Sequence, residues 1–130
     1  MKLEVGMYVR GKYYQYRGKI GKIIKNYNND LEIAYKDGVL KTNVSSFIDD
    51  NYDINGKQYK ASYNIIDILE VGDIISFYED IDNYKKQYVI GISDLITLDE
   101  IKDKITNDNI RLVSILTKEE MEQRAYKVGE

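Results

Sequence analysis

The chain has 130 residues, a formal net charge of −3, and neither cysteine nor histidine. This length suits one domain of ordinary size or two very small ones. The missing residue types exclude disulfides, thiol nucleophiles, zinc–thiolate sites and imidazole-dependent catalysis. No apolar run approaches the 18 residues of a membrane span, and the first residues lack the apolar segment of a signal peptide. We therefore expect a cytoplasmic protein without a membrane anchor.

The N-terminal segment contains a pattern that returns in the middle of the chain. Residues 3–9 read Leu-Glu-Val-Gly-Met-Tyr-Val, and residues 69–75 read Leu-Glu-Val-Gly-Asp-Ile-Ile. Each copy is followed by a loop and an apolar segment that contains glycine, at 18–24 and at 88–92. Glycine permits a turn with positive φ and a sharp bend in a strand. The pattern is typical of the start of an SH3-like small barrel and predicts two related β-units.

Two hairpins are predicted in the first half. Residues 31–41 read as strand, Asp-Gly turn and strand, and residues 52–61 do so around Asn-Gly. Between them, residues 42–48 fit a short helix or an irregular loop. Residues 51–62 also imitate a calcium loop, but Ser62 stands where that loop needs a glutamate. A hairpin is the better interpretation, and we expect no metal and no cofactor.

Two capping boxes predict helices in the second half. Each box is a threonine followed three residues later by a glutamate, Thr97 with Glu100 and Thr117 with Glu120. The threonine hydroxyl and the glutamate carboxylate can each bond a free amide at a helix start. Between them, residues 110–116 read as a buried strand.

Together these elements predict an α+β fold that is mainly antiparallel β. We expect SH3-like small-barrel units, either one or two in tandem, with one or two short helices near the C-terminus. The predicted first β-unit spans residues 1–62, and the second spans residues 63–130. Both units could belong to one compact domain.

Charge is distributed unevenly along the chain. Residues 1–48 carry a net charge of +5, and residues 49–130 carry −8. This asymmetry predicts either two faces with different partners or self-association of unlike faces into a homo-oligomer.

A stretch of basic residues interleaved with aromatic ones is the first candidate site. Its candidate ligand-binding residues are Arg10, Lys12, Tyr14, Tyr16, Arg17 and Lys19. Arginine and lysine neutralise phosphate, and a nucleobase stacks on tyrosine. The stretch would occupy the long loop after the first strand and bind an anionic ligand. The alternative is a solvated tyrosine-rich hairpin whose rings cover the core.

An acidic run is the second candidate site. Glu79, Asp80 and Asp82 lie in an expected loop between Phe77 and Tyr88. Such a loop suits docking on a basic protein surface. Paired carboxylates can also act as acid and base, but no other catalytic signal accompanies them. We therefore do not expect an enzyme.

Three blocks of the chain carry a resemblance to a known group of proteins. Residues 3–10 with 18–23, residues 60–73 and residues 114–121 resemble small, mostly uncharacterised proteins of phages and prophages of low-GC Gram-positive bacteria. The abundance of Ile, Lys, Tyr and Asn, whose codons are AT-rich, agrees with such a source. The resemblance implies a non-enzymatic antagonist of host antiviral defence. It would block an effector protein, as an anti-CRISPR does, or sequester a nucleotide signal.

The alternative function is a small-barrel regulator that binds nucleic acid. The basic first half favours this alternative, whereas the isoelectric point near 5.1 counts against it.

Overall fold

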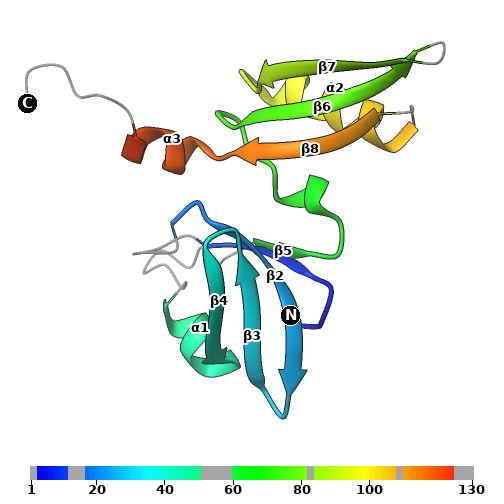
Figure 1. The fold of residues 1–130 in the computed structure, drawn as a ribbon. Helices are drawn as coiled ribbons and strands as arrows, with labels where there is room; N and C mark the ends of the chain where they lie inside the picture. The colour runs from blue at the N-terminus through cyan, green and yellow to red at the C-terminus, as the bar shows by residue number, and fades with distance from the viewer. Residues whose placement is uncertain (1–2, 12–16, 51–59, 82–83, 108–109, 125–130) are drawn as a thin grey trace, which may run out of the picture. The chain divides into compact units, whose positions relative to one another are not determined.

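The computed structural model of the chain describes residues 3–11, 17–50, 60–81, 84–107 and 110–124 (Figure 1). They belong to two compact units, residues 1–68 and 69–130. The fold is α+β with mostly antiparallel strands, as predicted. The expected boundary after residue 62 precedes a short 3₁₀ helix, η2 (Ile65–Ile68), which the first unit includes.

The first unit is built on a five-stranded antiparallel sheet with the order β4-β3-β2-β1-β5. Its strands are β1 (Tyr8–Arg10), β2 (Ile20–Tyr27), β3 (Asp30–Tyr35), β4 (Gly38–Asn43) and β5 (Lys60–Ser62). Helix α1 (Val44–Asp50) follows β4, so the segment after the hairpin is helical and not an irregular loop. The Asn43 side chain caps this helix, because its Oδ1 accepts a hydrogen bond from Ser46 N at 2.8 Å.

Two tight turns connect the three longest strands of this sheet. The predicted Asp-Gly hairpin is confirmed: β3 and β4 pair up to Tyr35 and Gly38, leaving Lys36 and Asp37 in the turn. Asn28 and Asn29 join β2 to β3 with φ values of 51° and 69°. Positive φ at both positions is the requirement of a type I′ turn, and asparagine tolerates it. The predicted Asn55-Gly56 hairpin lies outside the described residues.

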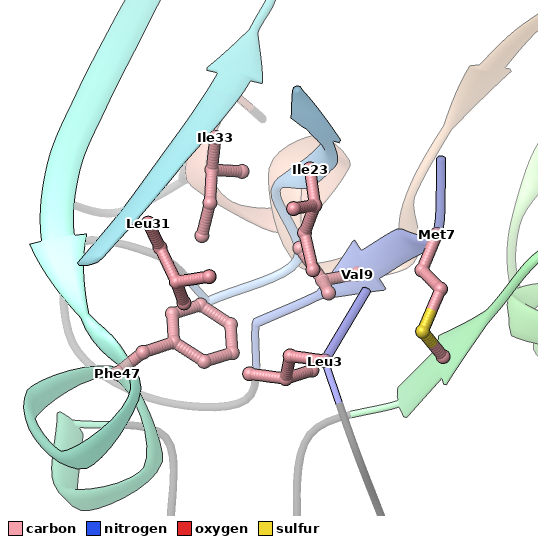
Figure 2. Packing of buried hydrophobic residues seen from close by; sticks show 7 residues of the cluster. All are labelled: Leu3, Met7, Val9, Ile23, Leu31, Ile33 and Phe47. Carbon is pink, nitrogen blue, oxygen red and sulfur yellow. The ribbon is translucent and has the colours of Figure 1, made fainter. Parts of the chain in front are cut away.

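A cluster of buried apolar side chains fills the first unit (Figure 2). Its members are Leu3, Met7, Val9, Ile23, Leu31, Ile33 and Phe47. The strand residues among them alternate with less buried neighbours, as expected for a sheet with one covered face. Gly21, opposite Val9, leaves room for this packing, because a Cβ there would lie 2.6 Å from Cγ2 of Ile33.

The second unit is built on a three-stranded antiparallel sheet with the order β7-β6-β8. Its elements are β6 (Ile74–Ile81), β7 (Tyr84–Gly91), α2 (Leu95–Asn107), β8 (Ile110–Leu116) and α3 (Lys118–Arg124). Helix α2 lies against one face of the sheet, and its Leu98 and Ile101 are buried (Figure 1). Residues 110–116 form the predicted strand, but it is an edge strand with no fully buried side chain. The expectation that it is buried was therefore wrong.

One of the two predicted helix caps is confirmed. Thr117 caps α3, because its hydroxyl accepts from Glu120 N at 3.3 Å and lies 3.4 Å from Oε1 of Glu120. The prediction that Thr97 caps α2 is wrong, because the helix already begins at Leu95. Asp94 takes that role, and its Oδ1 accepts from Thr97 N at 2.7 Å. A carboxylate is favoured there by the free amides and by the helix dipole.

The sequence repeat has a counterpart in local structure. Both copies form a four-residue turn, closed by an amide-to-carbonyl hydrogen bond of 3.1 Å in the first copy and 3.2 Å in the second. The glycines at the third position, Gly6 and Gly72, have φ values of 96° and 100°. In each copy, one isoleucine, Ile23 in β2 or Ile92 directly after β7, bonds both the glycine and the residue after it, at 2.7–2.9 Å. The two copies therefore begin their sheets in the same way.

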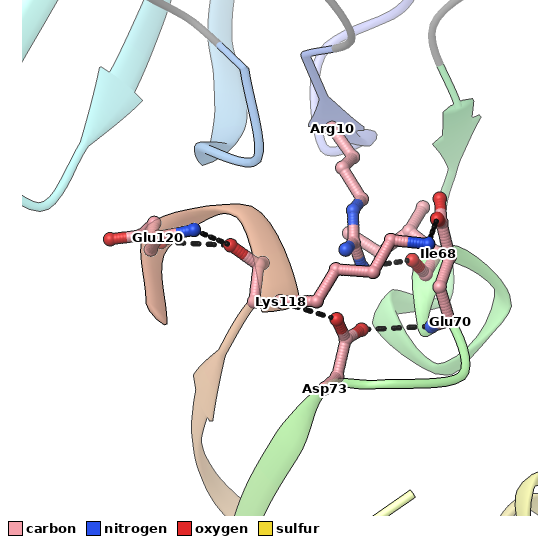
Figure 3. A network of polar contacts seen from close by, with 7 residues as sticks. Arg10, Ile68, Glu70, Asp73, Lys118 and Glu120 are labelled. Carbon is pink, nitrogen blue, oxygen red and sulfur yellow. Dashed lines mark hydrogen bonds and ion pairs between the residues drawn. The ribbon is translucent and has the colours of Figure 1, made fainter. Parts of the chain in front are cut away.

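The copies differ in the residue that follows the glycine. In the first copy, Met7 Sδ accepts a weak hydrogen bond from Glu4 N at 3.3 Å. In the second copy, the buried Asp73 accepts from Glu70 N at 2.8 Å and from Lys118 N at 3.0 Å (Figure 3). Lys118 Nζ also lies 3.0 Å from Oε1 of Glu70. Asp73 thereby ties the turn to the first residue of α3.

Candidate ligand-binding surface

Arg10, the first residue of the predicted basic site, is fully buried in the described structure. It ends β1, and its Nη1 donates a hydrogen bond to the carbonyl oxygen of Ile68 at 3.0 Å (Figure 3). This contact joins β1 to η2 within the first unit. A role of Arg10 in ligand binding stays a prediction. The contact that the structure shows for Arg10 is structural, because it links two elements of the same unit.

The rest of the basic stretch belongs to the connection between β1 and β2. Lys12, Tyr14 and Tyr16 lie outside the described residues. At the base of the connection, Gly18 N donates to the Gly11 carbonyl at 3.0 Å, and Gly11 N donates to the Lys19 carbonyl at 3.1 Å. Arg17 is exposed at this closed base, and Lys19 Nζ lies 3.4 Å from Oδ2 of Asp37.

The acidic run has a different setting from the one predicted. Glu79 and Asp80 belong to strand β6 and not to a loop, whereas Asp82 lies outside the described residues. Across the hairpin, Glu79 is opposite Lys86 and Asp80 is opposite Lys85. Opposite charges in register stabilise a strand pair. Lys86 therefore offsets the charge of Glu79.

A bulge in β2 creates a surface that the sequence analysis did not identify. The register between β2 and β3 shifts between Ile23 and Lys25, which leaves Ile24 as the extra residue. Ile23 is fully buried, so regular alternation would also turn Lys25 and Tyr27 toward the core. The bulge reverses this orientation, and both side chains are exposed, Tyr27 to 69%.

These side chains lie on one exposed face of strands β2, β3 and β4, which we call the Lys–Tyr face. Its members are Lys22, Lys25, Tyr27, Asp30, Glu32 and Lys41. All except Lys22 line an open groove of about 610 Å³, together with Leu31 and Thr42. The face thus joins one exposed aromatic ring to three lysines and two carboxylates.

The charges of the Lys–Tyr face follow the strand register. Lys25, Glu32 and Lys41 are directly opposite one another on three adjacent strands. Lys25 Nζ lies 3.4 Å from Oε2 of Glu32, and Lys25 remains 64% exposed. Glu32 therefore lies between two lysines in the strand register.

A second pair of residues extends the same chemistry toward β1. Lys22 is opposite Tyr8, and its Nζ lies 5.4 Å from the centre of the Tyr8 ring. This separation is within the range of a cation–π contact. The contact with Tyr8 thus holds a third lysine, Lys22, on the side of the bulge away from Tyr27.

The Lys–Tyr face suits a ligand that carries both a flat ring and phosphate. An exposed tyrosine offers a stacking platform, and lysine ammonium groups neutralise phosphate oxygens. Carboxylates on the same face can accept hydrogen bonds from the amino groups of a base. The combination favours a nucleotide over a simple polyanion.

Comparisons with known proteins found no matching family model, curated protein or solved structure. Among the described helices, none is long and apolar enough to cross a membrane. Within the same residues, no three carboxylates gather in a way that could hold a metal ion.

Proposed function

We propose that the protein acts by binding and not by catalysis, and that its Lys–Tyr face binds a nucleotide-containing anion. The observation that carries this proposal is the bulge at Ile24, which turns Lys25 and Tyr27 out of the core. Bulges are enriched next to functional sites, where they redirect a side chain. A stretch that needed only a stable sheet would keep regular alternation and place an apolar residue at position 25 or 27.

The charge of the first unit supports this proposal. Residues 1–68 contain 11 basic and 8 acidic residues, whereas residues 69–130 contain 8 and 14. The excess of acidic residues that lowers the isoelectric point thus lies in the second unit. The first unit, which contains the Lys–Tyr face, has an excess of basic residues. An excess of positive charge raises the local concentration of anionic ligands.

The strand order of the first unit supports an SH3-like small barrel as part of the proposal. In it, β1 lies between β2 and β5, and a long connection joins β1 to β2. That connection carries the predicted ligand residues Lys12, Tyr14 and Tyr16, and Arg17 stands exposed at its base.

Antagonism of host antiviral defence is the biological role we propose for this binding. Sequestering a nucleotide signal or covering a nucleic acid needs one ligand per protein and no catalytic residue. The resemblance to phage proteins supports this role, and so does the AT-rich residue usage. Direct docking on an effector protein through Glu79, Asp80 and Asp82 takes second place, because lysines oppose the first two across the hairpin.

Fluorescence anisotropy tests the proposal. A labelled single-stranded RNA decamer is titrated with the full chain at low and high salt, and ATP and a cyclic dinucleotide serve as unlabelled competitors. Direct binding that ATP and the cyclic dinucleotide displace at micromolar concentration indicates a nucleotide signal. Binding that only a longer strand displaces indicates a nucleic-acid ligand.

Two variants and one matched control locate the site. Tyr27→Ala removes stacking worth roughly 1–3 kcal/mol, so affinity should fall about 5- to 150-fold. Lys25→Ala with Lys41→Ala should weaken binding and flatten its salt dependence. Tyr63→Ala is the control, because Tyr63 is an exposed tyrosine outside the groove. Absence of binding at low salt, or equal binding by all variants, would refute the proposal.

A further inference from the structure

The second unit contains an apolar cleft between α2 and one face of its sheet. The cleft has a volume of about 110 Å³ and takes apolar lining from both layers. Phe77, Ile90 and Ile110 line it from the three strands, and Ile101 and Ile105 line it from the helix. It lies entirely within residues 69–130 and shares no residue with the Lys–Tyr face.

The cleft is present because the helix and sheet do not fill the space between them. Phe77 and Ile101 are buried, but Ile90, Ile105 and Ile110 are only half-buried although they face this space. Apolar side chains that remain partly in water gain free energy when a further apolar group covers them. An occupant that contacts these three isoleucines would complete the packing of this layer.

The rim of the cleft defines the charge of the occupant. Its polar members, Thr97, Glu100 and Lys104, all belong to α2. Glu100 and Lys104 are exposed, opposite in charge and one helical turn apart, so they can neutralise each other. The rim therefore offers no net charge to attract an ion. A charged group in the apolar interior would lose its hydration without a partner.

We propose that this cleft binds a small, uncharged apolar ligand about the size of a benzene ring. Cavities lined by leucine, isoleucine and phenylalanine accept benzene when they are of comparable size. The lining here consists of four isoleucines and one phenylalanine. The volume corresponds to a single ring or a short branched chain.

Nuclear magnetic resonance with benzene as the probe tests this site. Benzene is titrated into the isotope-labelled full chain, and benzoate and benzylamine are titrated in parallel. Saturable shifts should appear at the cleft residues of β6, β7, β8 and α2, and benzene should raise the melting temperature. The two charged analogues should bind at least tenfold more weakly.

Ile90→Phe and Val89→Phe form a matched pair of variants. Ile90 lines the cleft, whereas its neighbour Val89 is 68% exposed and points to the other face of the sheet. The first variant should lose benzene binding at least tenfold because its ring fills the space, and the second should keep it. Ile105→Phe fills the cleft from the helix and replaces the first variant if that one does not fold. The proposal is wrong if benzene produces no saturable shift, if its shifts lie elsewhere, or if the filled variant binds as before.

Discussion

At the scale of single residues, Arg10 and Arg17 have the same chemistry and different surroundings. Arg10 is fully buried beside the Ile68 carbonyl, and Arg17 is exposed. In the sequence both belong to one basic stretch, and nothing local separates them. The difference arises because β1 is an inner strand between β2 and β5, where an adjacent element can cover Arg10. The contact with Ile68 depends on residues 58 positions away, which a local pattern does not contain.

Replacing these two arginines should therefore have unequal effects on stability. Arg10→Ala removes a hydrogen bond from a charged donor to a buried carbonyl, which should lower the free energy of unfolding by about 1.5–3 kcal/mol. Arg17→Ala should change it by about 0.5 kcal/mol or less. Urea denaturation of both variants measures the difference. Equal stability of the two variants would show that the Arg10 contact contributes nothing.

Asp94 should give α2 a dependence on pH. Hydrogen bonds from Thr97 hold the pKa of Asp94 below its ordinary value of 3.8. The folded state therefore favours the charged carboxylate, so this stabilisation is present above pH 3.8 and is lost as pH falls through the lower folded pKa. Asparagine also caps helices, so Asp94→Asn should keep the helix and weaken this acid-dependent loss.

A pH titration of thermal unfolding measures the effect, with Asp99→Asn on the same helix as the control. Asp99 is exposed. The control should keep the pH dependence of the parent chain between pH 2 and pH 5. If Asp94→Asn and Asp99→Asn show identical pH dependence, Asp94 does not have the capping role assigned to it.

At the scale of elements, short-range patterns could be predicted and register could not. Two elements depend only on residues that are adjacent or three apart, the Asp37-Gly38 hairpin and the Thr117 cap. Both can therefore be predicted from the local sequence. The Asp94 cap was missed because Thr97 and Glu100 form a more familiar box inside the same helix. The bulge at Ile24 depends on how β2 and β3 align, which their separate patterns do not specify. The Lys–Tyr face was missed for the same reason.

The two strand glycines of the repeat make a direct comparison between the units. A Cβ at Gly21 would lie 2.6 Å from Ile33 and 2.8 Å from Tyr35, whereas a Cβ at Gly91 would meet nothing within 4 Å. Gly21→Ala should therefore cost roughly 1–3 kcal/mol of stability through overpacking. Gly91→Ala should be neutral or slightly stabilising, because glycine weakens a strand. Calorimetry that found equal losses for both would contradict the packing around Gly21.

At the scale of the whole molecule, the repeat begins two units that then develop differently. Both open with a Val-Gly turn whose glycine has positive φ, yet Met7 in one copy corresponds to the buried Asp73 in the other. The first unit continues as a five-stranded basic sheet, and the second as a three-stranded acidic unit with two helices. The charge asymmetry read from the sequence thus corresponds to a difference between units. It predicts that an anionic ligand binds the first of them.

Mapping of amide shifts during titration with a single-stranded RNA decamer tests this central claim most directly. In the full chain at low salt, the largest saturable changes should fall on residues 22–27, 30–32 and 41–42, and they should diminish as salt is raised. Tyr27→Ala should reduce them while the remaining spectrum stays unchanged. The largest changes falling within residues 69–124, or the absence of any saturable change, would contradict the assignment of ligand binding to the Lys–Tyr face.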